Sequence, residues 1–132
     1  MINRQEILDK FNSHCAYCGD EINLKSFQVD HIIPKRNFEF SILNKWEIPY
    51  FLEHLTEGDV NHIDNLFPSC RVCNKRKDTH SLEAFRNELH LQLPRANKTS
   101  SNYRMAKKFN QVIENPHFIT FFFEKDWGLT LD

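Results

Sequence analysis

Two neighbouring residues, Asp30 and His31, carry side chains that suit the hydrolysis of a phosphodiester bond. This reaction needs a base that activates water, and a cation that neutralises charge on the phosphate and on the leaving oxygen. Because a histidine side chain titrates near neutral pH, it suits the first task. Carboxylate and amide oxygens suit a hard cation such as Mg²⁺ or Mn²⁺, so Asp30 and Asn74 are candidate ligands. Taken alone, a histidine beside an apolar segment is more often structural than catalytic.

All four cysteines fall into two Cys-x-x-Cys pairs, Cys15/Cys18 and Cys70/Cys73. A disulfide framework rarely uses only such close pairs, and it needs an oxidising compartment. Two knuckles that donate four thiolates to one tetrahedral Zn²⁺ explain the spacing more simply. Gly19 follows the first pair and can adopt the left-handed conformation of a tight metal turn. We therefore predict a structural zinc site, with redox pairs or free core thiols as the alternatives.

Positive charge is concentrated in two segments, although the formal net charge of the 132-residue chain is −1. Residues 70–77 and residues 95–108 both contain cations and no acid. The near-neutral total counts against a nucleic-acid-binding protein, whereas the segments favour a surface for phosphates over ordinary solvated helix faces. The predicted nucleic-acid contacts in the first segment are Arg71, Lys75, Arg76 and Lys77.

The spacing of apolar residues predicts the helices and strands that must position these side chains. Residues 2–11 have the spacing of a short amphipathic helix. Residues 26–34 alternate as a strand does, and their terminal proline stops the ladder. Ser81 is a predicted N-cap for a helix through His90, which Pro94 would end. The histidine and aspartate therefore lie on the first strand, near its end.

The remaining segments are assigned more coarsely. Residues 35–64 are predicted to hold one or two short helices, and residues 74–79 to begin another. A loop is expected at 98–101 and a helix at 102–112. Residues 118–124, rich in phenylalanine, predict a strand. Hydrophobic residues make up 40% of the chain, no apolar run could cross a membrane and no secretory signal is visible, so we expect a folded cytoplasmic protein with no membrane partner.

Taken in order, these motifs resemble those of HNH nucleases that carry paired Cys-x-x-Cys knuckles. Such proteins share a Cys-x-x-Cys-Gly start, an Asp-His-Ile-x-Pro segment, a central Asn-Leu and a Cys-x-x-Cys-Asn-x-x-Lys end. All four pieces occur here between Cys15 and Lys77. Each piece is weak evidence alone, but the ordered combination is specific. The Ser-Leu-Glu-Ala-Phe-Arg segment at residues 81–86 also resembles stand-alone members from bacteria and phages.

The resemblance implies an α+β protein with a small ββα-metal core, in which a hairpin and a helix clasp one divalent ion, Mg²⁺ or Mn²⁺. His31 would be the general base, and Asp30 and Asn74 would bind the catalytic metal. Asn65 would orient the loop that bears the histidine. The expected core spans residues 1–80, with an insert at 35–64 that is longer than the loop of many relatives. An extension of helices and a C-terminal aromatic strand, residues 81–132, would pack on it.

The function implied by the resemblance is a metal-dependent endonuclease that cuts or nicks DNA, with RNA not excluded, in a bacterial or phage defence or restriction role. Two alternatives stay open. One is a zinc-stabilised nucleic-acid-binding module without catalysis, in which His31 has no chemical role. The other is a nuclease subunit that is active only within a larger complex.

Overall fold

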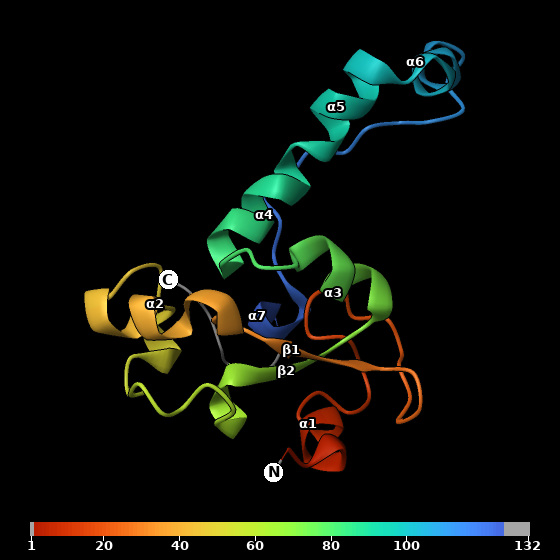
Figure 1. Ribbon diagram of the computed structural model, residues 1–132. Helices are drawn as coiled ribbons and strands as arrows, with labels where there is room; N and C mark the ends of the chain where they lie inside the picture. Colours follow the sequence, from red (N-terminus) through yellow and green to blue (C-terminus); the bar gives the residue numbers. More distant parts are fainter. Residues whose placement is uncertain (1, 126–132) are drawn as a thin grey trace.

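Two short strands, β1 (Gln28–His31) and β2 (Leu66–Ser69), pair antiparallel at the centre of the computed structural model, which describes residues 2–125 (Figure 1). In the register of this pair, Asp30 lies opposite Phe67 and His31 lies opposite Leu66. The helices are α1 (Arg4–Asp9), α2 (Phe38–Asn44), α3 (Arg71–Lys77), α4 (Leu82–His90), α5 (Gln92–Thr99), α6 (Ser101–Lys108) and α7 (Phe122–Lys125), with 3₁₀ turns η1 (Lys35–Asn37), η2 (Tyr50–Leu52) and η3 (Ile63–Asn65). Across residues 2–125, no helix is both long and apolar enough to span a bilayer.

Helix α3 follows β2 after a single residue and lies against β1. That residue is Cys70, whose sulfur accepts a hydrogen bond from the Cys73 N–H (3.3 Å) and so satisfies one free donor at the start of the helix. Figure 1 shows α3 and α1 on opposite sides of the two strands. The predicted α+β architecture, with a strand–strand–helix core, is confirmed.

The predicted N-terminal helix forms as α1 and covers the sheet. Its N-cap, Asn3, accepts a hydrogen bond from the Glu6 N–H at 3.1 Å. The helix buries Ile7 and Leu8 in a small cluster with Phe27. This burial removes apolar surface of α1 and of the strand region from water together, and therefore fixes the helix to the sheet.

The insert at residues 35–64 contains one regular helix, α2, among 3₁₀ turns, as the apolar spacing predicts. Phe38 of α2 is buried in the main core. The helix ends at Asn44, and the next residue, Lys45, adopts a left-handed conformation with φ of 53°. Trp46 and Tyr50 continue the helical spacing in the sequence but lie beyond this stop, and they stay 45% and 47% exposed.

Helices α4, α5 and α6 form an arm that projects away from the strands (Figure 1). The predicted cap is confirmed, because the Ser81 hydroxyl accepts a backbone N–H of α4 at 3.1 Å. The predicted end of the helix at His90 is also confirmed, but its predicted cause is wrong. Pro94 does not stop α4, because it lies in the first turn of α5, where its missing N–H costs no helical hydrogen bond. The predicted loop shrinks to Ser100, which caps α6.

The C-terminal aromatic strand predicted from the sequence does not form. The chain runs back extended from the arm and turns into the short helix α7. Phe122 and Phe123 donate backbone hydrogen bonds to Tyr17 and Ala16, each at 2.9 Å. These bonds tie the segment to the first knuckle and not to the sheet. The rings of Phe121 and Phe123 enter the main core beside Tyr17, so burial of large aromatic surface outweighs the strand preference of the sequence.

Candidate active site and metal centre

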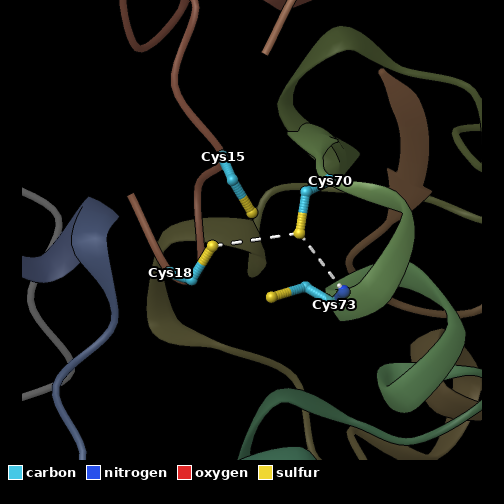
Figure 2. A group of neighbouring side chains, drawn as sticks. All are labelled: Cys15, Cys18, Cys70 and Cys73. Atoms are coloured by element: carbon cyan, nitrogen blue, oxygen red, sulfur yellow. Dashed lines mark hydrogen bonds between the residues drawn. The ribbon is translucent and has the colours of Figure 1, made fainter. Parts of the chain in front are cut away.

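Four cysteines converge from the two knuckles on one point (Figure 2). Their sulfur atoms all lie within 4.8 Å of one another, and no disulfide joins them. Cys18 Sγ is 3.8 Å from Cys70 Sγ. Sulfur ligands at about 2.3 Å from a tetrahedral ion lie about 3.8 Å apart, so the cluster is compatible with one zinc ion.

The protonation of these thiols also favours a cation at their centre. A hydrogen bond from Cys73 lowers the pKa of Cys15 to about 4, whereas burial raises the pKa of Cys18 to about 12. The pKa of Cys73 is raised above its usual value, first by its hydrogen bond with Cys15. One thiolate therefore opposes ionisation of its neighbours. A divalent cation would remove this conflict by stabilising all the thiolates together.

Gly19 closes the first knuckle. Its N–H donates to the Cys15 carbonyl at 3.0 Å, and its φ is +83°. A Cβ added at this position would lie 2.6 Å from Cδ1 of Phe122. The turn therefore requires a residue without a side chain, both for its left-handed backbone and for the close approach of the C-terminal segment.

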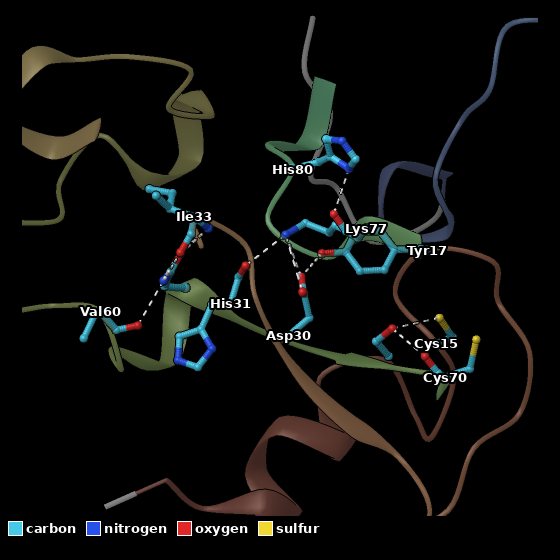
Figure 3. Close-up of polar contacts among 11 residues, drawn as sticks. Cys15, Tyr17, Asp30, His31, Ile33, Val60, Cys70, Lys77 and His80 are labelled. Atoms are coloured by element: carbon cyan, nitrogen blue, oxygen red, sulfur yellow. Dashed lines mark hydrogen bonds and ion pairs between the residues drawn. The ribbon is translucent and has the colours of Figure 1, made fainter. Parts of the chain in front are cut away.

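His31 is the last residue of β1, and its ring is partly exposed. The ring Nε2 lies 2.8 Å from Oδ1 of Asn61. Because an amide oxygen can only accept a hydrogen bond, Nε2 carries a hydrogen, and in the neutral imidazole Nδ1 then keeps a free lone pair. That lone pair is what a general base requires. Figure 3 shows the imidazole pointing away from Lys77, while the His31 carbonyl points towards it.

Asp30 points to the other side of the strand and is only 4% exposed. One carboxylate oxygen accepts a short hydrogen bond from the Tyr17 hydroxyl and lies 3.2 Å from Lys77 Nζ (Figure 3). Burial raises the pKa of Asp30, and the positive charge of Lys77 opposes this rise. The carboxylate is thus held by two partners, and it retains lone pairs that could bind a cation.

Lys77, predicted to contact a phosphate, has a fully buried side chain. Its ammonium donates to the His31 carbonyl at 2.9 Å and pairs with Asp30. Burial lowers the pKa of Lys77, and attraction to Asp30 counteracts it. The structure therefore places this charge inside the protein, where it joins α3 to both residues of the Asp-His pair.

Asn65 lies beneath the loop that follows His31, with its side chain fully buried. Its Oδ1 accepts the Ile33 N–H at 2.9 Å. Its Nδ2 donates to the carbonyls of Ile33 (3.2 Å) and Val60 (2.9 Å). The amide thus satisfies three backbone groups and fixes the chain two residues beyond the histidine, in line with the orienting role that the resemblance implies.

One cleft of about 250 Å³ brings the predicted base and the two predicted metal ligands together, whereas Asn65 does not line it. Asp30, His31 and Asn74 all line it, although the first two point to different sides of β1. Lys35 and Arg36 line the same cleft. Sequence reasoning missed this pair of cations, and its signal was their position directly after the Asp-His-Ile-Ile-Pro segment.

A second, larger cleft of about 660 Å³ adjoins the first, because Asn74 and Asp78 line both. Arg71 and Lys75 of α3 line this second cleft, as predicted phosphate contacts should. Arg76 is exposed on the same helix. Together the two clefts form a concave surface that carries cations beside His31.

A strand–strand–helix clasp beside a four-cysteine cluster, with Asp, His and Asn lining one cleft, defines a ββα-metal domain of the nuclease type. Residues 15–47 match the family described as HNH endonuclease. The chain, carrying both knuckles, belongs to the HNH endonuclease family.

Three relatives extend this assignment. The chain is 31% identical over 104 residues to the SPbeta prophage-derived putative HNH endonuclease YoqL of Bacillus subtilis, covering 78% of this chain and 36% of that protein. It is 27% identical over 74 residues to the CRISPR-associated endonuclease Cas9 of Corynebacterium diphtheriae, covering 56% of this chain and 5% of that protein. It is 29% identical over 76 residues to the Septu protein PtuB of Bacillus thuringiensis, covering 56% of this chain and 23% of that protein. The chain thus spans about a third or less of the length of these relatives.

Proposed function

We propose that this chain is a metal-dependent endonuclease that hydrolyses DNA phosphodiester bonds, by cutting or nicking, in a bacterial or phage defence or restriction role. The observation that carries the proposal is the cleft lined jointly by His31, Asp30 and Asn74. The names of two relatives, a putative prophage endonuclease and a CRISPR-associated endonuclease, support the same chemistry.

His31 is the general base of the proposed reaction. Its free Nδ1 takes a proton from a water molecule as the water oxygen attacks the phosphorus. The bond from phosphorus to the 3′ oxygen breaks, and the departing oxygen takes a proton from a solvent water molecule, which leaves 5′-phosphate and 3′-hydroxyl ends. Asn61 holds the imidazole at Nε2, and Asn65 holds the backbone that follows it, so the ring needs little reorganisation before it acts.

Asp30 and Asn74 would hold the catalytic cation, since their oxygens are donors that suit Mg²⁺ or Mn²⁺ and face one cleft. When bound, such an ion supplies positive charge beside the phosphate and the leaving oxygen. Tyr17 and Lys77 position the Asp30 carboxylate from inside the protein. The four cysteines would hold the structural Zn²⁺, which joins the two distant knuckles.

The cations that line the two clefts would bind the phosphate backbone. Lys35 and Arg36 lie beside His31, and Arg71 and Lys75 lie along α3. Contacts of this kind fix the position of a nucleic acid without reading its sequence. The 2′-hydroxyl of RNA would have to be tolerated in the same clefts, so RNA belongs among the tested substrates.

A second candidate is a nuclease subunit that acts within a larger complex. The insert exposes four large apolar side chains on or just after α2 and at η2, each at least 45% exposed: Phe40, Leu43, Trp46 and Tyr50. A cluster of exposed apolar residues is typical of a surface that another protein covers. In this case the isolated chain would bind DNA but cut it only with its partner present.

The central test compares the full chain with its His31→Ala variant on supercoiled plasmid and on RNA. Mg²⁺ or Mn²⁺ is added or omitted, and no chelator is used, because a chelator would also strip a cysteine-bound zinc. We expect cutting by the wild type only with added metal, and loss of cutting in His31→Ala. His117→Ala, which removes an exposed histidine far along the chain from the motif, is the matched control. Equal cutting by wild type and His31→Ala would reject the assigned base, and salt-sensitive binding without cutting would favour a non-catalytic module.

A further inference from the structure

Three side chains apart from the four cysteines and the catalytic cleft, those of His54, His62 and Asp64, converge at the surface. Their ligand atoms all lie within 4.8 Å of one another. His54 Nε2 is 2.8 Å from Asp64 Oδ2, and His62 Nδ1 is 3.8 Å from the same oxygen. These side chains are 52%, 37% and 46% exposed, so solvent reaches the point where they meet.

We propose that this cluster binds a second metal ion, a transition-metal cation of the Zn²⁺, Co²⁺ and Ni²⁺ class. Two imidazoles and one carboxylate are the donor set that such ions prefer, whereas Mg²⁺ prefers oxygen ligands alone. Ligand bonds of about 2.0–2.2 Å place tetrahedral neighbours about 3.4 Å apart. That separation lies between the two distances observed to Asp64, so a small adjustment of the rings closes the site.

The ion replaces two hydrogen bonds that the cluster now makes. One is the bond between His54 and Asp64, whose hydrogen occupies the nitrogen that would bind the metal. The other is the bond from the Asp64 N–H to His62 Nδ1 (3.0 Å), which caps η3. Three metal–ligand bonds replace these two contacts, and the remaining coordination positions open to solvent and can be filled by water.

The position of the cluster connects it to His31. Asn61, which binds the His31 ring, directly precedes His62, and Asn65, which holds the Ile33 backbone, directly follows Asp64. An ion on His62 and Asp64 would therefore restrain the segment that orients the imidazole. This consequence rests on the proposed function, whereas metal binding at the cluster does not.

The test titrates Co²⁺ into the full chain already loaded with Zn²⁺ at the cysteines, and follows the absorption spectrum. We expect one Co²⁺ to bind at this cluster, with weak visible bands and without the near-ultraviolet charge-transfer band of a thiolate ligand. A Co²⁺ bound at the Asp30–Asn74 site of the proposed function would be a separate ion, which excess Mg²⁺ displaces. His54→Gln should weaken binding at the cluster by about tenfold or more, and His62→Ala likewise. His117→Ala should bind as the wild type does. Because the readout is binding, it is independent of whether the chain cuts DNA.

Three results would overturn the proposal. The first is a wild type that takes up no further Co²⁺ at millimolar concentration. The second is unchanged affinity in His54→Gln, a surface variant whose only described polar partner is Asp64 and which should fold normally. The third is displacement by excess Mg²⁺ of the Co²⁺ whose binding depends on His54, which would show that oxygen ligands alone form the site.

Discussion

Arg86 donates two parallel hydrogen bonds to Glu124, from Nη1 to Oε1 at 2.7 Å and from Nη2 to Oε2 at 2.8 Å. Both side chains are buried, at 4% and 8% exposure. Arg86 also donates to the Ile119 carbonyl at 2.6 Å, and its guanidinium lies over the Phe121 ring. This bidentate pair joins α4 to α7 and so anchors the last described helix to the core.

Arg86→Met should lower the free energy of unfolding by about 3–5 kcal/mol, because Glu124 would remain buried without its cation. Urea denaturation of the wild type and the variant measures the change. Arg95→Met is the matched control, since its pair with Glu88 is largely solvated and should contribute far less to stability. Equal losses in the two variants would show that the buried pair has no special role in stability.

Asn65→Ala should both destabilise the protein and slow cutting. The change leaves an N–H and two carbonyls of Ile33 and Val60 without their partner, at about 1–3 kcal/mol for each group that stays buried. It also frees the chain that follows His31. Asn44→Ala removes an exposed amide that bonds a single carbonyl and serves as the control. Unfolding is followed in urea, and cutting at a temperature where both variants are folded; full activity in Asn65→Ala would contradict the orienting role.

Asn61→Asp should move the acid limb of the pH–rate profile to higher pH by about one unit. A carboxylate beside Nε2 stabilises the imidazolium form of His31, so the base is protonated over a wider range. Asn61→Ala should lower the rate without moving the acid limb. This comparison distinguishes the effect of the added charge from the effect of losing the hydrogen bond. Identical acid limbs in wild type and Asn61→Asp would mean that His31 is not the titrating base.

The double variant Lys35→Ala/Arg36→Ala should weaken DNA binding and reduce its dependence on salt. Each phosphate contact contributes about 0.9 to the slope of log K against log salt, so the slope should fall by about 2 if both cations bind phosphates. Binding is measured at several salt concentrations in a His31→Ala background, which prevents cutting. Lys45→Ala, an exposed cation of the insert, is the control. An unchanged slope would place the DNA away from this cleft.

The partly buried side chain of Lys10 should make the protein more stable as the pH rises. Burial lowers its pKa from 10.5 to about 8, while its ammonium donates to the carbonyls of Ile63 (2.6 Å) and Leu66 (2.8 Å). At pH values between these two pKa values, the lysine is protonated in the unfolded chain but not in the folded one. The free energy of unfolding should therefore rise with pH over this range, by up to about 3 kcal/mol. Lys10→Met should lack this part of the rise. The prediction would be contradicted if the free energies of unfolding of the two proteins, measured in urea, changed with pH in parallel.

The sequence predicted those parts of the site that depend on local spacing. Each Cys-x-x-Cys pair forms a knuckle by itself, and Asp30, His31 and Asn74 follow from motif order. The partners of these residues could not be predicted, because tertiary packing alone brings Tyr17 to Asp30 and Asn61 to His31. These pairs are 13 and 30 residues apart and carry no periodic signal.

Lys77 shows why a charge pattern can mislead. It ends a run of cations on α3, and its neighbours Lys75 and Arg76 are exposed. Lys77 lies three residues after Asn74, however, and residues at this spacing share a helix face. That face turns towards β1, so the charge pairs with Asp30 inside the protein and not with solvent. The aromatic C-terminal segment misled in the opposite way, since its phenylalanines fill the core without forming a strand.

The rings of Phe121 and Phe123 pack against Tyr17 and Phe67 at centroid distances of 5.3 and 4.8 Å. A ribosome delivers the cysteine pairs and the Asp-His motif long before it delivers these rings. The core can therefore close only after Phe123 has emerged, because the contacts that complete it join distant parts of the described chain. A nascent fragment that stops before these rings would hold every predicted catalytic side chain and still lack the packed interior that aligns them, so we expect such a fragment not to cut DNA.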